Sequence, residues 1–297
     1  MSEIKHIWAE KYKPKTVSEC ILPPRIKEKF EAFIKNGDFP HLILSGSPGV
    51  GKTTIAVALC EELGLEYIIL NGSKENGIDV VRTTLDEFCR IKSLNGKKKV
   101  VIYDEADHLN QNSTQPALRN FMDSYESDNI FIYTCNYVQK IIEPLVSRCF
   151  SIDFYIYQDE IEYMVSSFRR RCMEILDNEG ITYDKKVLTK YIVMKYPDFR
   201  STLIGLKGHA LTGQIDAGIL RQKKDYDIDT LIEILKSKSY SKARAWASNN
   251  YDDNIYGSMM VIERHTASPI DTAEAIIILL ILVTSNLSLI AIINSSV

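Results

Sequence analysis

Short apolar runs alternate with amphipathic stretches between residues 40 and 153. The apolar runs are rich in Ile, Val, Tyr, Phe and Leu without strict alternation, as is typical of strands covered on both faces. We expect strands at Leu42–Ser45, Tyr67–Asn71, Val100–Asp104, Ile130–Cys135 and Cys149–Phe154. The amphipathic stretches are expected as helices at Lys52–Leu63, Ile78–Ile91 and Thr114–Tyr125, the last capped by Ser113 or Thr114. Strands and helices that alternate in this way predict a parallel α/β sheet.

The pattern changes after Phe154, where the strand-like runs stop. Residues 158–220 have helical spacing, with a break at 178–180 and a new start at 196–198. Residues 228–297 form a second helical stretch. We therefore expect an α/β domain over residues 1–153, a helical domain over 154–224 and a further helical domain over 225–297.

The stretch from Ala275 to Val297 has no charged residue, and Ile276–Val283 is an unbroken apolar run. Its length permits a membrane span. Against a span, polar residues at 284–286 interrupt the stretch, and no Lys or Arg follows Arg264 to anchor an end. We favour a buried terminal helix, with a membrane span and an atypical tail as the alternatives.

Composition narrows the class of protein. The chain has 297 residues, of which 45% are hydrophobic and 25% charged, as in soluble globular proteins. A net charge of −3 does not favour general affinity for nucleic acid, so any DNA contact is expected from a local basic surface. The six cysteines form no C-x-x-C pair, and no zinc site or disulfide framework is expected. Reduced thiols and an amino terminus without a signal sequence predict a cytoplasmic protein.

A glycine-rich motif lies between the first expected strand and the helix that follows it. Residues 46–53 read Gly-Ser-Pro-Gly-Val-Gly-Lys-Thr and fit G-x-x-x-x-G-K-[ST] at every fixed position. Glycines allow backbone N–H groups to point at phosphate oxygens, and the helix amino terminus adds its positive dipole end. We expect ATP here, with Lys52 on the β- and γ-phosphates, Thr53 on Mg²⁺, and further contacts from Gly49, Val50, Gly51 and Thr54. A glycine-rich turn with a chance lysine is the alternative.

Acidic and amide side chains end the third and fourth expected strands. Asp104 is expected to hold Mg²⁺ through its water shell, and Glu105 to activate the attacking water as a general base. Asn136 is expected beside the γ-phosphate, where it orients that water. Solvated acids and a turn-forming asparagine are the alternatives. The strand and helix between the glycine-rich loop and Asp104 favour the ATPase interpretation.

Several motifs lie outside the ATP-binding elements. The segment Trp8–Pro14 reads W-A-E-K-Y-K-P, Ser147–Cys149 reads S-R-C, and Pro197–Arg200 reads P-D-F-R. The stretches Glu19–Pro23, Gly77–Arg82 and Asp104–Asp107 complete the set. Together these motifs resemble the AAA+ clamp-loader family, which includes replication factor C small subunits and the large ATPase subunits of T-even-type phage loaders. The resemblance extends over about residues 6–260.

The resemblance implies an AAA+ P-loop ATPase with a parallel five-stranded sheet, a helical lid and a helical carboxyl-terminal collar. It also implies an ATP-hydrolysing subunit that opens a sliding clamp and loads it onto primer–template DNA during viral replication. The implied partners are further ATPase subunits, a distinct accessory subunit, the clamp and DNA, in the cytoplasm of a bacterial host. No similarity extends beyond about Glu263, so the uncharged tail does not support the collar.

Roles of individual residues also follow from the resemblance. It places Arg148 as an arginine finger on a neighbouring subunit's ATP, and Arg200 on the γ-phosphate of its own subunit. Adenine contacts are implied for Ala9, Glu10, Lys11, Tyr12 and Ile21. Contacts with the DNA backbone are implied for Lys74, Arg82, Gln115 and Arg119, and Gln115 would couple the ATP site to DNA. The alternative for Arg148 is a surface arginine after a serine cap, and the alternative for Arg200 is a partner for a nearby acidic side chain.

The helix over Leu85–Ile91 corresponds to the clamp-facing surface of the family. Phe88 is expected either as an anchor for the clamp or as a core residue. Lys97–Lys99 is expected as a solvated start of a strand, with a DNA-binding patch as the alternative.

Two other functions are kept open. The literal D-E-A-D at 104–107 suggests a helicase, although no second RecA-like half and no H-R-x-G-R-x-x-R element is found. The uncharged tail suggests a membrane-tethered, non-enzymatic scaffold. We favour the clamp-loader ATPase because Lys52, Thr53, Asp104, Glu105 and Arg148 are all present.

Overall fold

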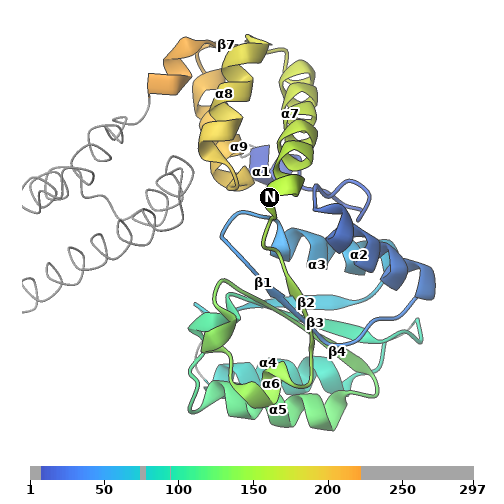
Figure 1. The fold of residues 1–297 in the computed structure, drawn as a ribbon. Helices are drawn as coiled ribbons and strands as arrows, with labels where there is room; N and C mark the ends of the chain where they lie inside the picture. The colour runs from blue at the N-terminus through green and yellow to red at the C-terminus, as the bar shows by residue number, and fades with distance from the viewer. Residues whose placement is uncertain (1–7, 74–77, 94, 222–297) are drawn as a thin grey trace, which may run out of the picture. The chain divides into compact units, whose positions relative to one another are not determined.

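The computed structural model describes residues 8–73, 78–93 and 95–221 (Figure 1). The expectations for Lys74, for the domain over 225–297 and for the uncharged tail therefore lie outside the described residues. Arg82 lies in a described helix, but only its backbone is described.

A five-stranded sheet with the strand order β2-β3-β4-β1-β5 forms the centre of the amino-terminal domain. The strands are β1 Leu42–Ser45, β2 Tyr67–Asn71, β3 Lys99–Asp104, β4 Asn129–Cys135 and β5 Phe150–Asp153. Each pairs with its neighbours in parallel, as expected. The carboxyl ends of β3, β4 and β1 therefore lie side by side, which brings the loops after these strands together.

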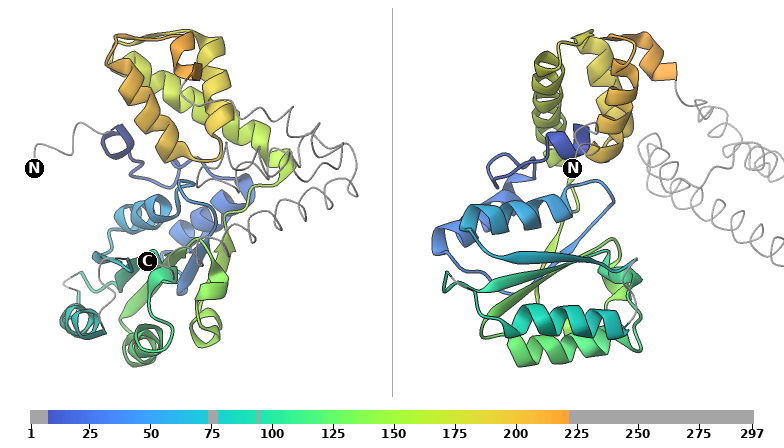
Figure 2. Two further views of the ribbon diagram at one scale, coloured as in Figure 1. Left: turned by 90° about the vertical axis from the view of Figure 1, so that its left-hand side faces the viewer. Right: turned by 180° about the vertical axis from the view of Figure 1, so that it is seen from behind.

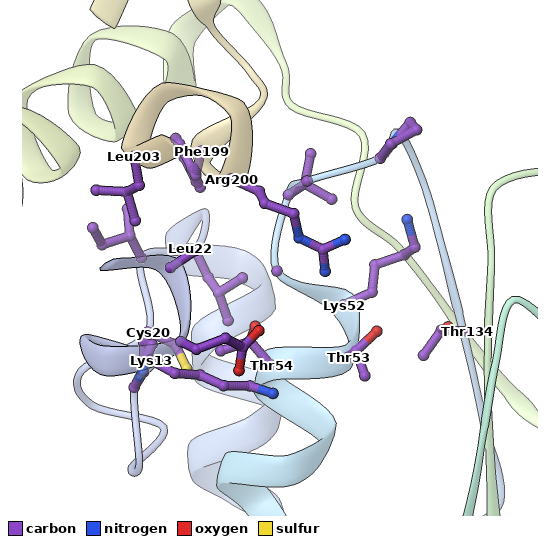
Figure 3. A pocket seen from close by; sticks show the side chains of 18 of the residues that line it. Lys13, Cys20, Leu22, Lys52, Thr53, Thr54, Thr134, Phe199, Arg200 and Leu203 are labelled. Atoms are coloured by element: carbon purple, nitrogen blue, oxygen red, sulfur yellow. The ribbon is translucent and has the colours of Figure 1, made fainter. Parts of the chain in front are cut away.

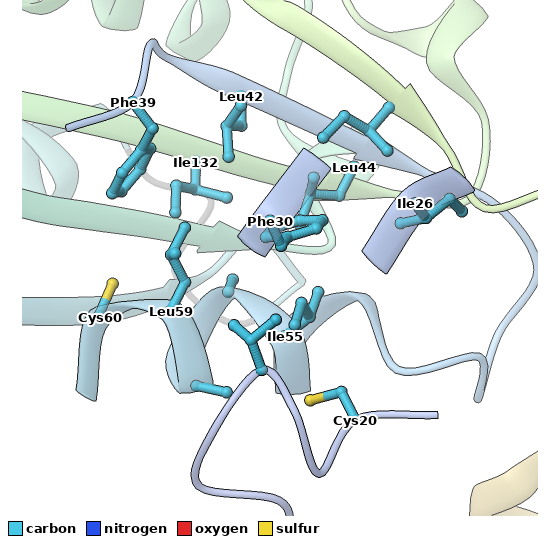
Figure 4. Close-up of a cluster of buried hydrophobic side chains, with 14 of the residues drawn as sticks. Cys20, Ile26, Phe30, Phe39, Leu42, Leu44, Ile55, Leu59, Cys60 and Ile132 are labelled. Atoms are coloured by element: carbon cyan, nitrogen blue, oxygen red, sulfur yellow. The ribbon is translucent and has the colours of Figure 1, made fainter. Parts of the chain in front are cut away.

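Helices cover both faces of the sheet (Figure 2). One face is covered by α2 Pro24–Asn36 and α3 Lys52–Leu63, and the other by α4 Ile78–Arg90, α5 Thr114–Tyr125 and α6 Glu143–Val146. A cluster of buried hydrophobic side chains lies between the sheet and the helices on each face. Because successive residues of a strand point to opposite faces, Leu42 and Leu44 pack against α2 and α3 (Figure 4), whereas Ile43 packs in the cluster on the opposite face. Short 3₁₀ helices occur at Ala106–His108, Val138–Lys140, Gln158–Glu160 and Ala217–Arg221.

Three helices form the lid: α7 Ile161–Asn178, α8 Lys185–Lys195 and α9 Phe199–Ala210. Their shared core includes Leu176, Leu188 and Leu206, together with Trp8 from the amino-terminal helix α1 Trp8–Lys11. Asp198 caps α9 by accepting a hydrogen bond from the Ser201 N–H (2.9 Å), which confirms the helix start expected after 196–198.

Two expectations about local structure were wrong. Strands do not stop after Phe154, because β6 Thr182–Tyr183 and β7 Gln214–Ile215 pair in parallel within the lid. Strands of two residues are too short to produce a periodic signal in the sequence. Of the two expected caps of α5, Thr114 is the first helical residue and Ser113 is at the cap position, yet the Ser113 side chain makes no capping hydrogen bond. Instead, Asn110 Oδ1 accepts from the backbone N–H of Ser113 (3.0 Å).

Candidate active site

The glycine-rich loop joins β1 to α3 and needs glycine at defined positions. Gly46, Gly49 and Gly51 have φ values of 146°, 77° and 96°, which L-residues with a Cβ rarely adopt. A Cβ on Gly46 would lie 2.8 Å from Phe154 Cβ, and one on Gly49 would lie 2.1 Å from Asp198 Oδ1. The glycine-rich loop therefore packs closely against its neighbours and ends directly at the amino terminus of α3. The first N–H groups of this helix have no partner within the helix and are available at the site.

Lys52 is the first residue of α3, and its side chain is enclosed although it is charged. The residue is 8% exposed, and its Nζ donates to the carbonyls of Gly46 (2.7 Å) and Ser47 (2.9 Å). A third bond reaches Asn136 Oδ1 (3.0 Å), so Asn136, which was expected beside the γ-phosphate, lies next to the lysine of the phosphate-binding loop. Burial lowers the pKa of Lys52, while its three oxygen partners suit a positively charged ammonium.

Hydroxyl groups surround the Asp104 carboxylate at the end of β3. Thr53 Oγ1 and Thr134 Oγ1 both donate to Asp104 Oδ1, at 2.5 Å and 2.6 Å. Thr53 and Asp104 are thus close enough to share Mg²⁺, and their oxygens are the ligands that this ion prefers. Among the residues that the structure describes, no group of three His, Cys, Asp or Glu could hold a metal by itself. The two residues therefore fit an ion that is also held by phosphates and water.

Thr134 is a site residue that sequence reasoning missed. Besides donating to Asp104, its Oγ1 accepts a hydrogen bond from the Glu105 N–H (3.2 Å). It therefore orients both acids from the neighbouring strand β4. Its position two residues before Asn136, near the end of a strand, was the available signal.

Glu105 has the only positive φ, 58°, of a residue other than glycine in the described parts of the chain. Such backbone angles are uncommon in residues other than glycine and occur preferentially at functional sites. Its Oε2 accepts a hydrogen bond from Ser73 Oγ, in the turn after β2. Sequence reasoning also missed Ser73, because a single serine after a strand has no distinctive spacing.

A cavity of about 380 Å³ extends from the glycine-rich loop to the lid (Figure 3). Nearly all expected nucleotide contacts line it: Ala9, Glu10, Tyr12, Ile21, Gly49, Val50, Gly51, Lys52, Thr53, Thr54, Asp104, Glu105, Asn136 and Arg200. The lid adds Phe168, Phe199 and Leu203, which sequence reasoning did not identify. These apolar side chains and Ile21 are suited to cover the flat face of a base.

Lys11 does not line this cavity, so the expected adenine contact is not supported. Its Nζ instead pairs with Glu179 Oε1 at 2.5 Å, at the end of α7. Tyr12 Oη donates to the same oxygen (2.6 Å), and Arg171 donates to the Tyr12 carbonyl (3.3 Å). The amino-terminal segment is thereby tied to the lid.

The two expected γ-phosphate arginines differ in position. Arg200, at the start of α9, points into the cavity on the side of Lys52 (Figure 3). Arg148 is not among the residues that line the cavity. Its guanidinium donates to the Asp123 carboxylate (2.7 and 3.2 Å) and to the Pro144 carbonyl (2.8 Å). The pairing lowers the pKa of Asp123 and raises that of Arg148.

The residues expected at DNA also differ in position. Gln115 is fully buried, so direct contact with DNA is excluded in this conformation. Its amide donates to the carbonyls of Leu109 (3.0 Å) and Lys140 (2.9 Å) and accepts from the Ile142 N–H (2.8 Å). Arg119, by contrast, is exposed on α5, and its Nε lies 3.7 Å from Asp123 Oδ2.

Lys99 is not a solvated residue, contrary to expectation. It is 4% exposed, and its Nζ donates to the carbonyls of Phe88 (2.5 Å) and Ile91 (2.9 Å). A buried cation thus satisfies the free carbonyls where α4 ends. Phe88 is half-buried against the hydrophobic cluster beneath α4 and α5. The ammonium of Lys99 lies 3.9 Å from the centroid of the Phe88 ring.

None of the helices in the described residues is both long and apolar enough to cross a bilayer.

The fold and the site define a P-loop ATPase with the AAA+ arrangement of strands. Residues 42–157 match the family described as "ATPase family associated with various cellular activities (AAA)". Residues 159–221 match the "Sliding-clamp-loader large subunit, AAA+ ATPase lid domain".

Similar proteins extend this match over most of the chain. The sliding-clamp-loader large subunit of Enterobacteria phage T4 is 40% identical over 253 residues, or 83% of this chain and 79% of that protein. The corresponding subunit of Escherichia phage RB69 is 39% identical, over 82% and 77% of the two chains. A replication factor C small subunit of Archaeoglobus fulgidus is 34% identical, over 80% and 76%. The chain belongs to the sliding-clamp-loader large-subunit family of AAA+ ATPases.

Solved structures agree on the fold alone. A mutant of Thermotoga maritima RuvB has a TM-score of 0.61 and 16% identity, over 86% of this chain and 94% of that chain. The expected family and the AAA+ fold with its lid are therefore confirmed.

Proposed function

We propose that this chain is the ATP-hydrolysing subunit that opens a sliding clamp and places it on primer–template DNA. One observation carries the proposal. The cavity collects the phosphate-binding loop, both strand-end acids and Arg200, while the remaining arginine of the family pattern, Arg148, lies outside it. A site of this kind is completed by a second copy of the chain.

Within one subunit, the geometry supports a division of roles. Lys52 neutralises the β- and γ-phosphates, and the N–H groups that begin α3 hold their oxygens. Thr53 and Asp104 would hold Mg²⁺, which neutralises charge on the phosphates when it is bound. Glu105 accepts a proton from the attacking water, which Asn136 orients. Arg200 contacts the γ-phosphate and so links the state of the nucleotide to the lid.

Arg148 completes the site of a neighbouring subunit as an arginine finger. Its ion pair with Asp123 is solvent-accessible, and pairs of this kind contribute little to stability. Moving the guanidinium from Asp123 to a γ-phosphate therefore costs little. A separated subunit hydrolyses ATP slowly under this proposal, because the charge of the transition state lacks its last partner.

The remaining parts of the proposal concern partners and organisation. Lys74, Arg82 and Arg119 contact the DNA backbone, and Gln115 relays DNA binding to the ATP site through its buried hydrogen bonds. The clamp binds near α4, and an accessory subunit completes the loader in the host cytoplasm. Residues 1–153, 154–224 and 225–297 form the ATPase, lid and collar domains.

The test measures ATP turnover of the full chain in the assembled loader, with and without clamp and primer–template DNA. We expect both additions to stimulate turnover, and Arg148→Ala to abolish the stimulated turnover while ATP binding is retained. Arg170→Ala, at an exposed arginine on α7, is the control and retains turnover. Normal DNA-stimulated hydrolysis by Arg148→Ala contradicts the finger assignment, and strand unwinding would instead support a helicase.

A further inference from the structure

Residues 153–160, here called the core–lid linker, join β5 to α7. Arg25, in the first turn of α2, contacts this linker at four points. Its Nε donates to Glu160 Oε1 at 2.9 Å, and its Nη1 to the Asp153 carbonyl at 3.4 Å. Its Nη2 donates to the Tyr155 carbonyl, and the guanidinium carbon lies 4.6 Å from the Tyr157 ring centroid.

This set of contacts requires an arginine. A guanidinium presents donors in a rigid plane and stacks on aromatic rings, so three nitrogens can address three linker residues while its face covers a fourth. A lysine has a single nitrogen and cannot reproduce the arrangement. The side chains of Arg25 and Glu160 are 34% and 11% exposed, so the ion pair is better shielded from solvent than most surface pairs.

The position of Arg25 on α2 has an electrostatic cost. The residue lies in the first turn, at the positive end of the helix dipole, and no acidic residue accompanies it there. Helix stability alone therefore does not favour a cation at this place. The contacts with the linker account for it.

The linker also has internal contacts that depend on the same residues. Glu160 Oε2 accepts from the Tyr157 N–H (2.9 Å), and Asp153 Oδ1 accepts from the Tyr155 N–H (3.0 Å). The rings of Tyr155 and Tyr157 meet edge to face, with centroids 5.4 Å apart. Arg25 thus holds together a segment that already folds back on itself.

We infer that Arg25 is a positioning residue that fixes the core–lid linker, and with it the place from which the lid presents Arg200 to the nucleotide. The claim that Arg25 fixes the linker stands independently of the proposed function. Only the consequence for the nucleotide rests on the proposed role of Arg200. Removing Arg25 frees the linker to adopt several conformations, so the lid samples a wider range of positions. The binding groups in the core remain intact, because Arg25 does not line the cavity.

The experiment measures the core–lid distance in the full chain. Spin labels are attached at Glu31→Cys on α2 and Lys190→Cys on α8, in a background with Cys149→Ser, because the other native cysteines are buried. Distances are recorded with a nonhydrolysable ATP analogue, without clamp or DNA. Arg25→Gln is compared with Lys29→Gln, a lysine of the same helix whose Nζ lies 5.3 Å from the ring centroid of Phe150 on β5.

We expect Arg25→Gln to widen the distance distribution about twofold, because the lid samples additional states, and Lys29→Gln to leave it unchanged. ATP turnover falls about three- to tenfold through kcat, with KM for ATP nearly unchanged. Arg25→Lys recovers little, since it restores the charge without the planar donors. If Arg25→Gln does not fold, Glu160→Gln takes its place, because it removes the same ion pair from the linker side. We expect Glu160→Gln to widen the distance distribution and lower kcat as well.

A distribution and a kcat that both equal those of the parent, in Arg25→Gln or in its substitute Glu160→Gln, overturn the inference. The distance measurement needs neither clamp nor DNA. Its failure can therefore be distinguished from a failure of the clamp-loading proposal, which is read from stimulated turnover.

Discussion

The two ends of the nucleotide cavity are built differently. At the phosphate end, the ammonium of Lys52 donates short hydrogen bonds to the glycine-rich loop, and the carboxylate of Asp104 accepts them from α3 and β4. At the opposite end, the amino-terminal segment and the lid meet through contacts such as Lys11 with Glu179, with Lys11 45% exposed. The phosphate end is fixed by the fold of one domain, whereas the other end depends on a contact between separate segments.

This difference predicts where substitutions matter most. Phosphate-end residues are preorganised and contact the groups that change charge during hydrolysis, so their loss affects turnover strongly. Residues between the amino-terminal segment and the lid adjust binding, and they are individually worth little because water screens them.

Lys52→Ala is expected to have the largest effect. Removing the ammonium leaves the oxygens of Gly46, Ser47 and Asn136 without their buried donor and takes away the charge that faces the phosphates. We expect turnover to fall about 10³-fold and ATP binding to weaken strongly, measured by steady-state hydrolysis and by titration with a fluorescent ATP analogue. Lys97→Ala, an exposed lysine that donates to the Leu63 carbonyl, is the matched control. Turnover within a few-fold of the parent would contradict the assignment.

Glu105→Gln separates binding from chemistry. The amide cannot accept the proton of the attacking water, so kcat is expected to fall about 10²- to 10⁴-fold. ATP binding is retained, because Lys52, Thr53 and Asp104 are unchanged. Single-turnover hydrolysis and equilibrium binding distinguish the two quantities. A parallel loss of binding and turnover would show that Glu105 holds the nucleotide instead of activating water.

The phosphate end was also the part of the site that the sequence predicted best. Lys52, Asp104 and Asn136 stand at the ends of regular elements, and parallel pairing of β1, β3 and β4 brings such ends together. The helices α3 and α5 begin and end at the predicted residues, because glycine, proline and apolar spacing mark them locally. The parallel sheet and the covering of both its faces follow from the same alternation, whereas the order of the strands was not predicted.

Residues whose role depends on tertiary neighbours were missed or wrongly placed. Lys99 and Gln115 are polar and were expected at the surface, yet both are buried and bonded to backbone groups of other elements. Lys11 was assigned to adenine, but Glu179, at the far end of α7, is its partner. Ser73 carries one hydroxyl and no pattern, so only the folded chain identifies its hydrogen bond to Glu105.

Thr134→Val tests whether the missed residue matters at the phosphate end. The substitution keeps the shape of the side chain but removes the donor to Asp104 and the acceptor for the Glu105 N–H. We expect kcat to fall about tenfold, and the melting temperature to fall by a few degrees because the Glu105 N–H loses its acceptor. Thr189→Val, on the lid, removes a comparable hydroxyl that donates to the Lys185 carbonyl and serves as control. Equal kcat values in the two variants would remove Thr134 from the site.

Glu179→Gln is expected to have the smallest effect. Hydrogen bonds from Lys11 and Tyr12 lower the pKa of Glu179 below its usual 4.5, so the carboxylate stabilises the fold at neutral pH. This contribution is present above that usual pKa and is lost as pH falls through the lowered one. We expect a melting temperature about 1–2 °C below that of the parent at pH 7, with the difference disappearing in acid. Thermal scans of both proteins across pH measure it, and a difference that grows in acid would contradict the pairing.

The central claim, that a neighbouring subunit completes each ATP site, is tested most directly by mixing two inactive variants. Lys52→Ala subunits lack the phosphate contact but carry Arg148, and Arg148→Ala subunits carry an intact phosphate end without the finger. Turnover is measured in loaders assembled from each variant alone and from an equal mixture, with clamp and primer–template DNA present. The account predicts little turnover from either variant alone and clear recovery in the mixture. A mixture as inactive as its components, or full turnover by Arg148→Ala alone, would contradict it.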